Sequence, residues 1–175
     1  SMLPVTYGYL LMLGAEGLKY VTEMAILNAN YLASSFEKLG FKILFKGKQG
    51  RVGHEMIWDC SAFNKEYGIS ELDIAKRLMD FGFHAPTLSF PVHGTLMVEP
   101  TESEPKEELD RFIEALKTIR EEMCEVAEGK ADKTDNVLKN APHTHKVLTA
   151  DEWTHTYPRS KAAYPLPWVA ENKFW

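Results

Sequence analysis

The stretch that decides the fold runs from Leu39 to Asp59 and reads LGFKILFKGKQGRVGHEMIWD. Within it, aromatic and aliphatic residues alternate with lysine and leucine over 41–45, and a second apolar and aromatic run occupies 54–59. Such runs are typical of strands, and the glycine-rich segment 47–53 between them is typical of a turn. The stretch therefore predicts an antiparallel β-hairpin.

Helices are predicted on both sides of this hairpin. Over residues 16–39, apolar side chains recur mostly at three- and four-residue steps, as they do on a helix that covers a core. Gly40 then suits a left-handed helix end. A second helix is predicted over 70–81, because Ser70 and Asp73 form a variant of the capping box at its start.

The rest of the pattern adds one strand, one long helix and a tail. Residues 95–98 are predicted as a short strand, and residues 105–128 carry apolar side chains along one helical face. The element order αββαβα favours an α+β fold, with an antiparallel or mixed sheet and helices on one face. After Gly129 we expect an extended tail whose aromatic rings pack along the domain or a neighbouring subunit: Trp153, Tyr157, Tyr164, Trp168, Phe174 and Trp175.

Composition limits the possible classes of function. The chain has 175 residues, 45% of them hydrophobic, and a net charge of -5, which suits one globular core with an appendage. No basic stripe is present, which argues against a nucleic-acid partner. Cys60 and Cys124 belong to no CxxC pair, so the sequence predicts neither a disulfide framework nor a zinc knuckle and favours a reducing compartment.

The apolar stretch from Leu3 to Leu13 is too short and too interrupted to cross a bilayer. It has two interpretations. Either an upstream part of a longer chain covers it, or it starts an amphipathic first helix. Neither interpretation involves a membrane.

The densest run of unusual residues is FGFHAPTLSFPVHGT over 81–95. Two prolines restrict its backbone and two glycines permit special conformations, so the run can form a loop that holds His84, Thr87 and Ser89 rigidly at a surface. The competing interpretation is an ordinary helix-to-strand connection containing a histidine with satisfied hydrogen bonds.

The next run, VEPTESEP over 98–105, precedes the long helix. Thr101 with Glu104, or Ser103 alone, is expected to cap the free N–H groups of that helix. An additional ligand-facing role is open to Glu99 or Thr101.

Other polar residues give weaker signals. His143, His145 and His155 suggest a metal site only superficially, because no cysteine or second ligand cluster accompanies them. Arg51 and Arg159 can each pair with a carboxylate, or serve as surface or tail-docking arginines. The sequence contains no GxGxxG, GxxxxGK, HExxH or GxSxG motif, so residue patterns alone define no self-contained active site.

Four runs nevertheless resemble one family. These are GAEGLKYVTEMAILNANYLA, RVGHEMIWD, DIAKRLMDFGFHAPTLSFPVHGTLMVEPTESEPKEELDRFIEAL and AAYPLPWVAENKFW, which together cover nearly the whole chain. They resemble the carboxy-terminal part of glycine decarboxylase, the P-protein of the glycine cleavage system. FHAPT followed by GTLMVEPTES is the most specific part of the resemblance.

The resemblance implies the small carboxy-terminal domain of a fold-type-I enzyme that uses pyridoxal phosphate (PLP). Residues 1–13 are then a linker region from a large domain, 14–128 the small domain and 129–175 the tail. In the family reaction glycine is decarboxylated and its aminomethyl group passes to the lipoyl arm of H-protein. No lysine here matches the family's PLP-lysine motif, so we expect no catalytic residue in this chain, a Schiff-base lysine upstream, and no cofactor binding or activity by the chain alone.

By the same resemblance, His84, Thr87 and Ser89 are candidates for a loop that faces the cofactor, the substrate or the lipoyl channel. Arg51 and Arg159 are further candidates. The implied partners are the large PLP-binding domain or subunit, a second protomer, lipoylated H-protein and glycine, in the cytoplasm of a bacterium or the mitochondrion of a eukaryote. The alternatives are a small-ligand-binding or dimerisation module without catalysis, and a metal-binding domain that uses the tail histidines.

Overall fold

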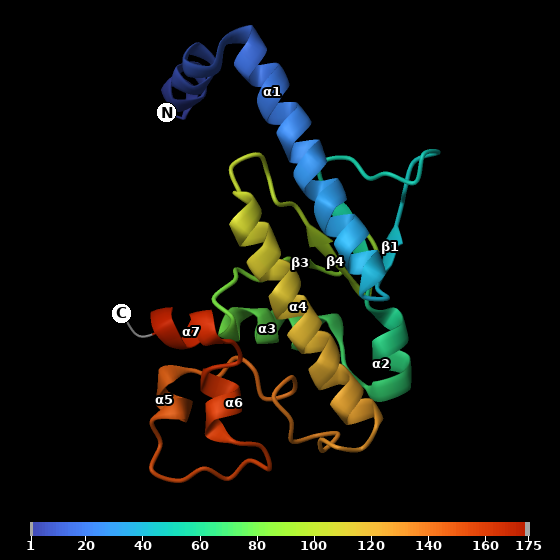
Figure 1. Ribbon diagram of the computed structural model, residues 1–175, viewed down its shortest axis with the longest axis vertical. Helices are drawn as coiled ribbons and strands as arrows, with labels where there is room; N and C mark the ends of the chain where they lie inside the picture. The colour runs from blue at the N-terminus through green and yellow to red at the C-terminus, as the bar shows by residue number, and fades with distance from the viewer. Residues whose placement is uncertain (1, 174–175) are drawn as a thin grey trace.

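The computed structural model describes residues 2–173. At its centre lies a four-stranded antiparallel sheet in the order β1-β2-β4-β3 (Figure 1). Its strands are β1 (Lys42–Leu44), β2 (Met56–Asp59), β3 (Thr87–Leu88) and β4 (Thr95–Val98). In the predicted hairpin, Ile43 of β1 pairs with Trp58 of β2, so the antiparallel pairing is confirmed. Strand β4 then pairs with β2 and with β3.

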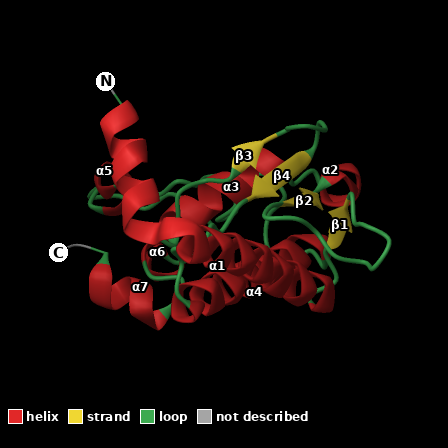
Figure 2. Cartoon of the chain, turned by 90° about the horizontal axis from the view of Figure 1, so that it is seen from above, coloured by secondary structure: helices red, strands yellow, loops and turns green. Residues whose placement is uncertain are grey.

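Two long helices cover one face of this sheet, as Figure 2 shows: α1 (Leu3–Lys38) and α4 (Lys106–Ala127). Helix α3 (Glu71–Asp80) packs against α4 and against β3 and β4, and α2 (Ser61–Tyr67) connects β2 to α3. This arrangement confirms the predicted α+β class. The sequence pattern did not predict α2 or β3, whose apolar periodicity is too short to detect.

Aromatic side chains fill the space between the sheet and these helices. Trp58 is fully buried on β2, and its ring centroid lies 4.5 Å from that of Phe41 and 5.5 Å from that of Phe36. Leu96 of β4 and Leu116 of α4 complete this layer with no exposed surface. Each large apolar side chain contributes about 1.5–3 kcal/mol when it is buried in this way.

Local signals at the ends of two helices behave as predicted. Gly40 has φ +82°, and Phe41 N–H donates to the carbonyl of Phe36, a helix end that glycine favours. At the start of α3, Ser70 accepts from the Asp73 N–H while the Asp73 carboxylate accepts from the Ser70 N–H. Both capping predictions are therefore confirmed.

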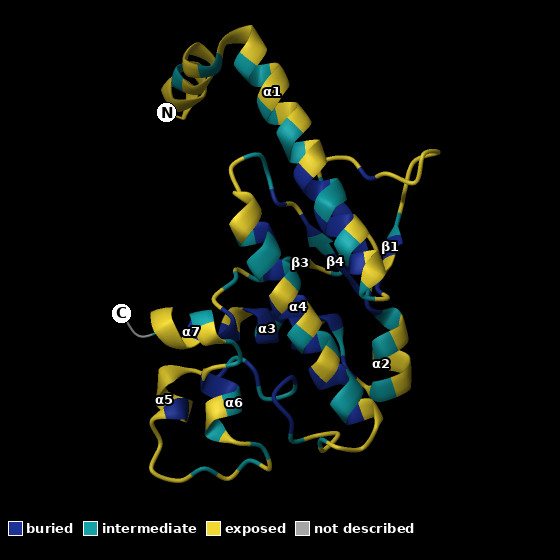
Figure 3. Cartoon of the chain, viewed as in Figure 1, coloured by how far each residue is buried: buried dark blue, intermediate teal, exposed yellow. Residues whose placement is uncertain are grey.

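The first part of α1 has an unusual surface. The stretch from Leu3 to Leu13 is helical, as one of its two interpretations held, and Gly14 with φ +61° separates it from the rest of α1 by a kink. Figure 3 colours most of its residues as exposed. Leu3, Val5 and Met12 keep 77%, 75% and 87% of their surface accessible. Within residues 2–173, no helix is long and apolar enough to span a bilayer.

The tail from Gly129 lies along the domain, as expected, and includes three short helices that the sequence pattern did not predict. These are α5 (His145–Leu148), α6 (Arg159–Ala163) and α7 (Pro167–Asn172). Leu138 and Val169 of the tail are buried in the main core. Trp153, Tyr157 and Trp168 pack against buried side chains, whereas Phe174 and Trp175 lie outside the described residues.

A buried arginine joins the tail to the domain. Arg77 of α3 has no exposed surface, and its Nε and Nη2 donate to the two carboxylate oxygens of Glu122 on α4 at 3.0 and 2.7 Å. Its Nη1 donates to Asp80 at 2.9 Å. The remaining donors reach the carbonyl oxygens of Lys161 and Ala162 in α6. All five guanidinium N–H groups therefore have acceptors.

The network continues from Asp80 into the tail. The backbone N–H of His143 donates to Oδ1 of Asp80, and the His143 Nδ1 lies 2.7 Å from Oδ2. The other ring nitrogen of His143 is 2.8 Å from the Tyr157 hydroxyl, and burial raises the pKa of Tyr157 to about 12. Burial opposes ionisation of Asp80, but hydrogen bonds from His143 and the charge of Arg77 outweigh it and hold the pKa of Asp80 below its usual range.

We predict that Arg77→Met lowers the free energy of unfolding by about 3–5 kcal/mol, because it leaves two buried carboxylates without their counter-ion. Urea unfolding followed by circular dichroism measures this loss. The exposed pair of Lys106 and Asp110 offers a control, and Lys106→Met should change the result little. A similar small loss for both variants would contradict the role of Arg77.

A second prediction concerns acid. Because its folded-state pKa is depressed, Asp80 stabilises the fold fully above its unfolded pKa of about 3.9, and this contribution disappears as pH falls through the folded pKa. Asp80→Asn should therefore be less stable at neutral pH. Its stability should also fall less steeply below about pH 4, by up to about 1.4 kcal/mol per pH unit. Parallel pH profiles of the two proteins would refute this assignment.

Candidate functional site

A groove of about 470 Å³ opens where α1, α4 and β4 meet. Its floor is apolar and includes Leu32 of α1, Val98 of β4, and Leu109 and Phe112 of α4. Its two walls are residues 82–87, and residues 97, 99 and 100 with Glu104 and Glu108. The two most specific runs of the sequence thus both line one groove.

His84 and Thr87 line this groove. Thr87 belongs to β3 and pairs with Met97 of β4, so strand pairing sets the distance between the walls at this point. Both His84 and Thr87 are exposed, and Ala85 and Pro86 between them are half-buried. The predicted loop therefore presents two of its three candidate side chains to a common space.

Ser89, the third candidate, is not among the groove-lining residues and instead holds the loop in place. Its hydroxyl donates to Oε1 of Glu71 at 2.7 Å and accepts from the Gly94 N–H at 3.3 Å. Its own N–H donates to the carbonyl of Thr95. Ser89 has φ +51°, a left-handed conformation that costs a residue other than glycine about 1–3 kcal/mol and is common near functional sites.

The opposite wall ends in a similar corner at Thr101, where φ is +60°. The predicted capping of α4 by Thr101, Glu104 or Ser103 is wrong: the N-cap is Pro105, and no side chain described in the structure caps it. The left-handed turn directs the Thr101 hydroxyl back to Ser103, with an Oγ–Oγ distance of 2.9 Å. The Thr101 carbonyl accepts from the side chain of Asn28 instead.

The tail supports the groove from below. Phe83, from the first wall, lies edge-on to Phe112 and to Trp168 of α7, with ring centroids 5.1 and 5.9 Å apart. The guanidinium of Arg111 stacks 4.1 Å from the Trp168 ring, and Trp168 also donates to Glu114. Docking of the tail therefore contributes to the position of the loop.

The two candidate arginines lie elsewhere. Arg51 is exposed in the connection between β1 and β2, and within residues 2–173 its guanidinium forms no ion pair. Arg159 donates to the carbonyl of Ala150 and stacks 5.3 Å from the ring of Trp153. Both partners belong to the tail, so these contacts join parts of the tail to one another and do not show that Arg159 docks it on the domain.

The tail histidines have structural partners. His143 belongs to the buried network, and His155 pairs with Asp135 at 2.7 Å. Among the residues that the structure describes, no group of three or more His, Cys, Asp or Glu side chains can hold a metal ion. Cys60 and Cys124 are free thiols, and burial raises the pKa of Cys60.

Pyridoxal phosphate does not fit this groove alone. A site for it requires a lysine for the Schiff base and donors for its phosphate. The described lining has three glutamates, Glu99, Glu104 and Glu108, and neither lysine nor arginine. Burial lowers the pKa of Lys173, but its Nζ lies against the carbonyl of Asp80 and not in the groove. The described residues of this groove therefore cannot form a Schiff base with the cofactor by themselves.

The sequence pattern missed two residues that form hydrogen bonds to the ends of the groove walls: Asn28 and Glu71. Asn28 carried a detectable signal, because it interrupts the apolar stripe of α1 between Ala25 and Leu32 and is only 6% exposed. A polar residue at such a position needs a specific partner. Glu71 gave no comparable signal, because acids are common in the first turn of a helix.

The family model that matches this chain and three of its relatives share one enzyme name, glycine dehydrogenase. Residues 21–143 match the family model described as glycine dehydrogenase, C-terminal domain. The chain is 59% identical over 175 residues to the glycine dehydrogenase (decarboxylating) of Bacteroides fragilis and 61% identical over 171 residues to that of Flavobacterium johnsoniae. It is 55% identical over 175 residues to the enzyme of the same name from Bdellovibrio bacteriovorus.

These matches cover 100%, 98% and 100% of this chain and 18% of each relative. The fold defines a small α+β domain, and the chain spans only a small part of the length of the relatives that it matches. The chain belongs to the glycine dehydrogenase C-terminal domain family.

A comparison of unfolding free energies distinguishes Ser89, which supports the loop, from His84 and Thr87, which line the groove. We predict that Ser89→Ala lowers the free energy of unfolding by about 1–3 kcal/mol, because the buried Glu71 carboxylate loses its donor. His84→Ala and Thr87→Ala remove exposed side chains and should change it little. Urea unfolding distinguishes these results, and equal effects of all three variants would rule out the supporting role of Ser89.

Proposed function

We propose that this chain is the carboxy-terminal domain of a PLP-dependent glycine dehydrogenase (decarboxylating). The complete enzyme decarboxylates glycine and transfers its aminomethyl group to the lipoyl arm of H-protein. The observation that carries the proposal is that the whole of this chain matches relatives with that name. The match covers only 18% of each relative's own length. These relatives contain the segment within one longer chain, which supports a single polypeptide over separate subunits.

In this proposal the upstream part of the enzyme binds PLP through its own lysine, and the chain alone is inactive. The apolar side chains exposed on the first part of α1 support a covering partner, because patches of this kind mark interaction surfaces (Figure 3). The occupant is the large PLP-binding domain, with a second protomer as a further partner. The relatives named above are bacterial, which supports a cytoplasmic enzyme.

The groove is the part of this domain that faces the shared active site. Its apolar floor suits the aliphatic lipoyl arm better than glycine, which has no apolar side chain to bury. His84 and Thr87 orient the arm, and the walls exclude water from it. Ser89 supports the loop, while the positions of Arg51 and Arg159 favour structural roles. A module that only binds a small ligand or dimerises has no comparable support.

The cofactor assignment is tested by reduction with borohydride. With excess PLP, the isolated chain should give only sparse, scattered labelling of its lysines on peptide mass mapping. The full-length enzyme should give one stoichiometric adduct at a lysine outside this segment. A stoichiometric adduct at one lysine of this chain would refute the proposal.

The same full-length enzyme tests the groove. His84→Ala and Thr87→Ala should raise the KM for lipoylated H-protein about tenfold and leave the PLP absorption spectrum unchanged. Arg51→Ala, outside the groove, is the matched control and should retain the parent KM. If the His84 and Thr87 variants also retain it, the groove does not bind the arm.

A further inference from the structure

Two left-handed corners flank the groove. Ser89 follows the wall that contains Thr87, and Thr101 directly follows Pro100 of the opposite wall. Neither corner residue is a glycine, so each needs contacts that hold its backbone in this conformation. Besides bonds within these runs, each corner has a hydrogen-bond partner on a helix outside them.

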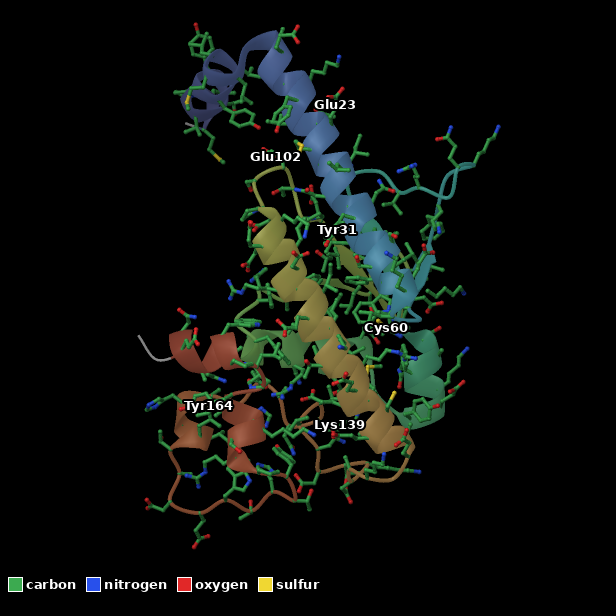
Figure 4. All side chains as sticks on the ribbon, in the orientation of Figure 1. Glu23, Tyr31, Cys60, Glu102, Lys139 and Tyr164 are labelled. Carbon is green, nitrogen blue, oxygen red and sulfur yellow. The ribbon has the colours of Figure 1, made fainter. Side chains whose placement is uncertain are left out.

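The Thr101 corner depends on Asn28 of α1. The Asn28 amide donates to the carbonyl of Thr101 at 3.0 Å and to the carbonyl of Glu104 at 3.3 Å. One side chain therefore joins both ends of the turn that leads from the groove wall into α4. In Figure 4, Glu102 lies on this turn beside α1, and its carboxylate accepts a hydrogen bond from Tyr9.

The Ser89 corner depends on Glu71 of α3. Glu71 is only 8% exposed, and its carboxylate accepts the hydroxyl of Ser89 at 2.7 Å. This bond connects the start of α3 to the end of β3, across the loop that contains His84. The hydroxyl of Ser89 has the Gly94 N–H as a second partner, so the corner is held from both sides.

We propose that Asn28 and Glu71 are positioning residues that hold the groove walls in their binding conformation by fixing these two corners. The inference rests on the proposed function of the groove. Neither side chain lines the groove, so each acts through Thr101 or Ser89. Without its hydrogen bond, a corner can leave the left-handed conformation, and only a fraction of the molecules then has a groove that can bind its ligand. The apparent affinity of the groove for that ligand is multiplied by this fraction.

Asn30 provides a matched control on the same helix. Its amide group exchanges two hydrogen bonds with the backbone of Val52, at 2.9 and 3.0 Å, in the connection between β1 and β2. Asn30→Ala therefore removes a comparable set of bonds to a different loop. It should lower the thermal midpoint much as Asn28→Ala does without affecting the groove.

In the full-length enzyme, Asn28→Ala should raise the KM for lipoylated H-protein about tenfold with a smaller change in kcat. Asn30→Ala should keep the parent KM. Hydrogen exchange should accelerate at residues 101–104 in the first variant and near Val52 in the second. If Asn28→Ala does not fold, Asn28→Leu keeps the side-chain volume and the helix but donates no hydrogen bond to the turn, and it should raise KM in the same way.

Two substitutions at Glu71 test its role at the Ser89 corner. Glu71→Gln retains an oxygen that accepts from Ser89 and should keep the parent KM, whereas Glu71→Ala should raise it about tenfold. Parent KM values for Asn28→Ala, Asn28→Leu and Glu71→Ala would overturn the inference. If His84→Ala raises KM in that case, only the positioning role fails. If His84→Ala also has the parent KM, the proposed function of the groove fails as well.

Discussion

The buried guanidinium of Arg77 joins three parts of the chain that are far apart in sequence: α3, α4 and the tail. Removal of a charge from water is costly, and the cost is offset here only because every N–H group has an acceptor and two carboxylates surround it. The packing of α3 on α4 and the docking of α6 therefore depend on one another. A change at any of these acceptors leaves a buried charge without its partner.

This dependence extends from the tail to the groove. The network holds α6 through the carbonyls of Lys161 and Ala162, and α7 follows directly and places Trp168 beneath Phe83. Phe83 begins the wall that contains His84 and Thr87. The tail, which has no apolar periodicity of its own, thus becomes part of the support of a site whose side chains come from other segments.

Hydrogen bonds hold the walls of the groove, but its lining within residues 2–173 lacks the basic side chains that a PLP site requires. Its walls are held at two left-handed corners by hydrogen bonds to Glu71 and from Asn28, yet the described lining supplies neither lysine nor arginine. In the proposed function, such a surface orients a substrate and excludes water, and the cofactor is held by another part of the enzyme. Such a division of roles between parts of one protein agrees with a chain that spans only a small part of its relatives' length.

The sequence by itself determined the features that depend on neighbouring residues. Alternation over 41–45 determined the hairpin, Gly40 and the Ser70–Asp73 box determined helix ends, and FHAPT with GTLMVEPTES indicated the family. Only the tertiary structure decided the partners of Arg77, the turn at Thr101 that replaced the expected cap of α4, and the groove. These features depend on contacts between residues tens of positions apart, 45 for Arg77 with Glu122 and 73 for Asn28 with Thr101. Local periodicity cannot encode such pairs, because each side chain finds its acceptor only after the helices have packed on the sheet.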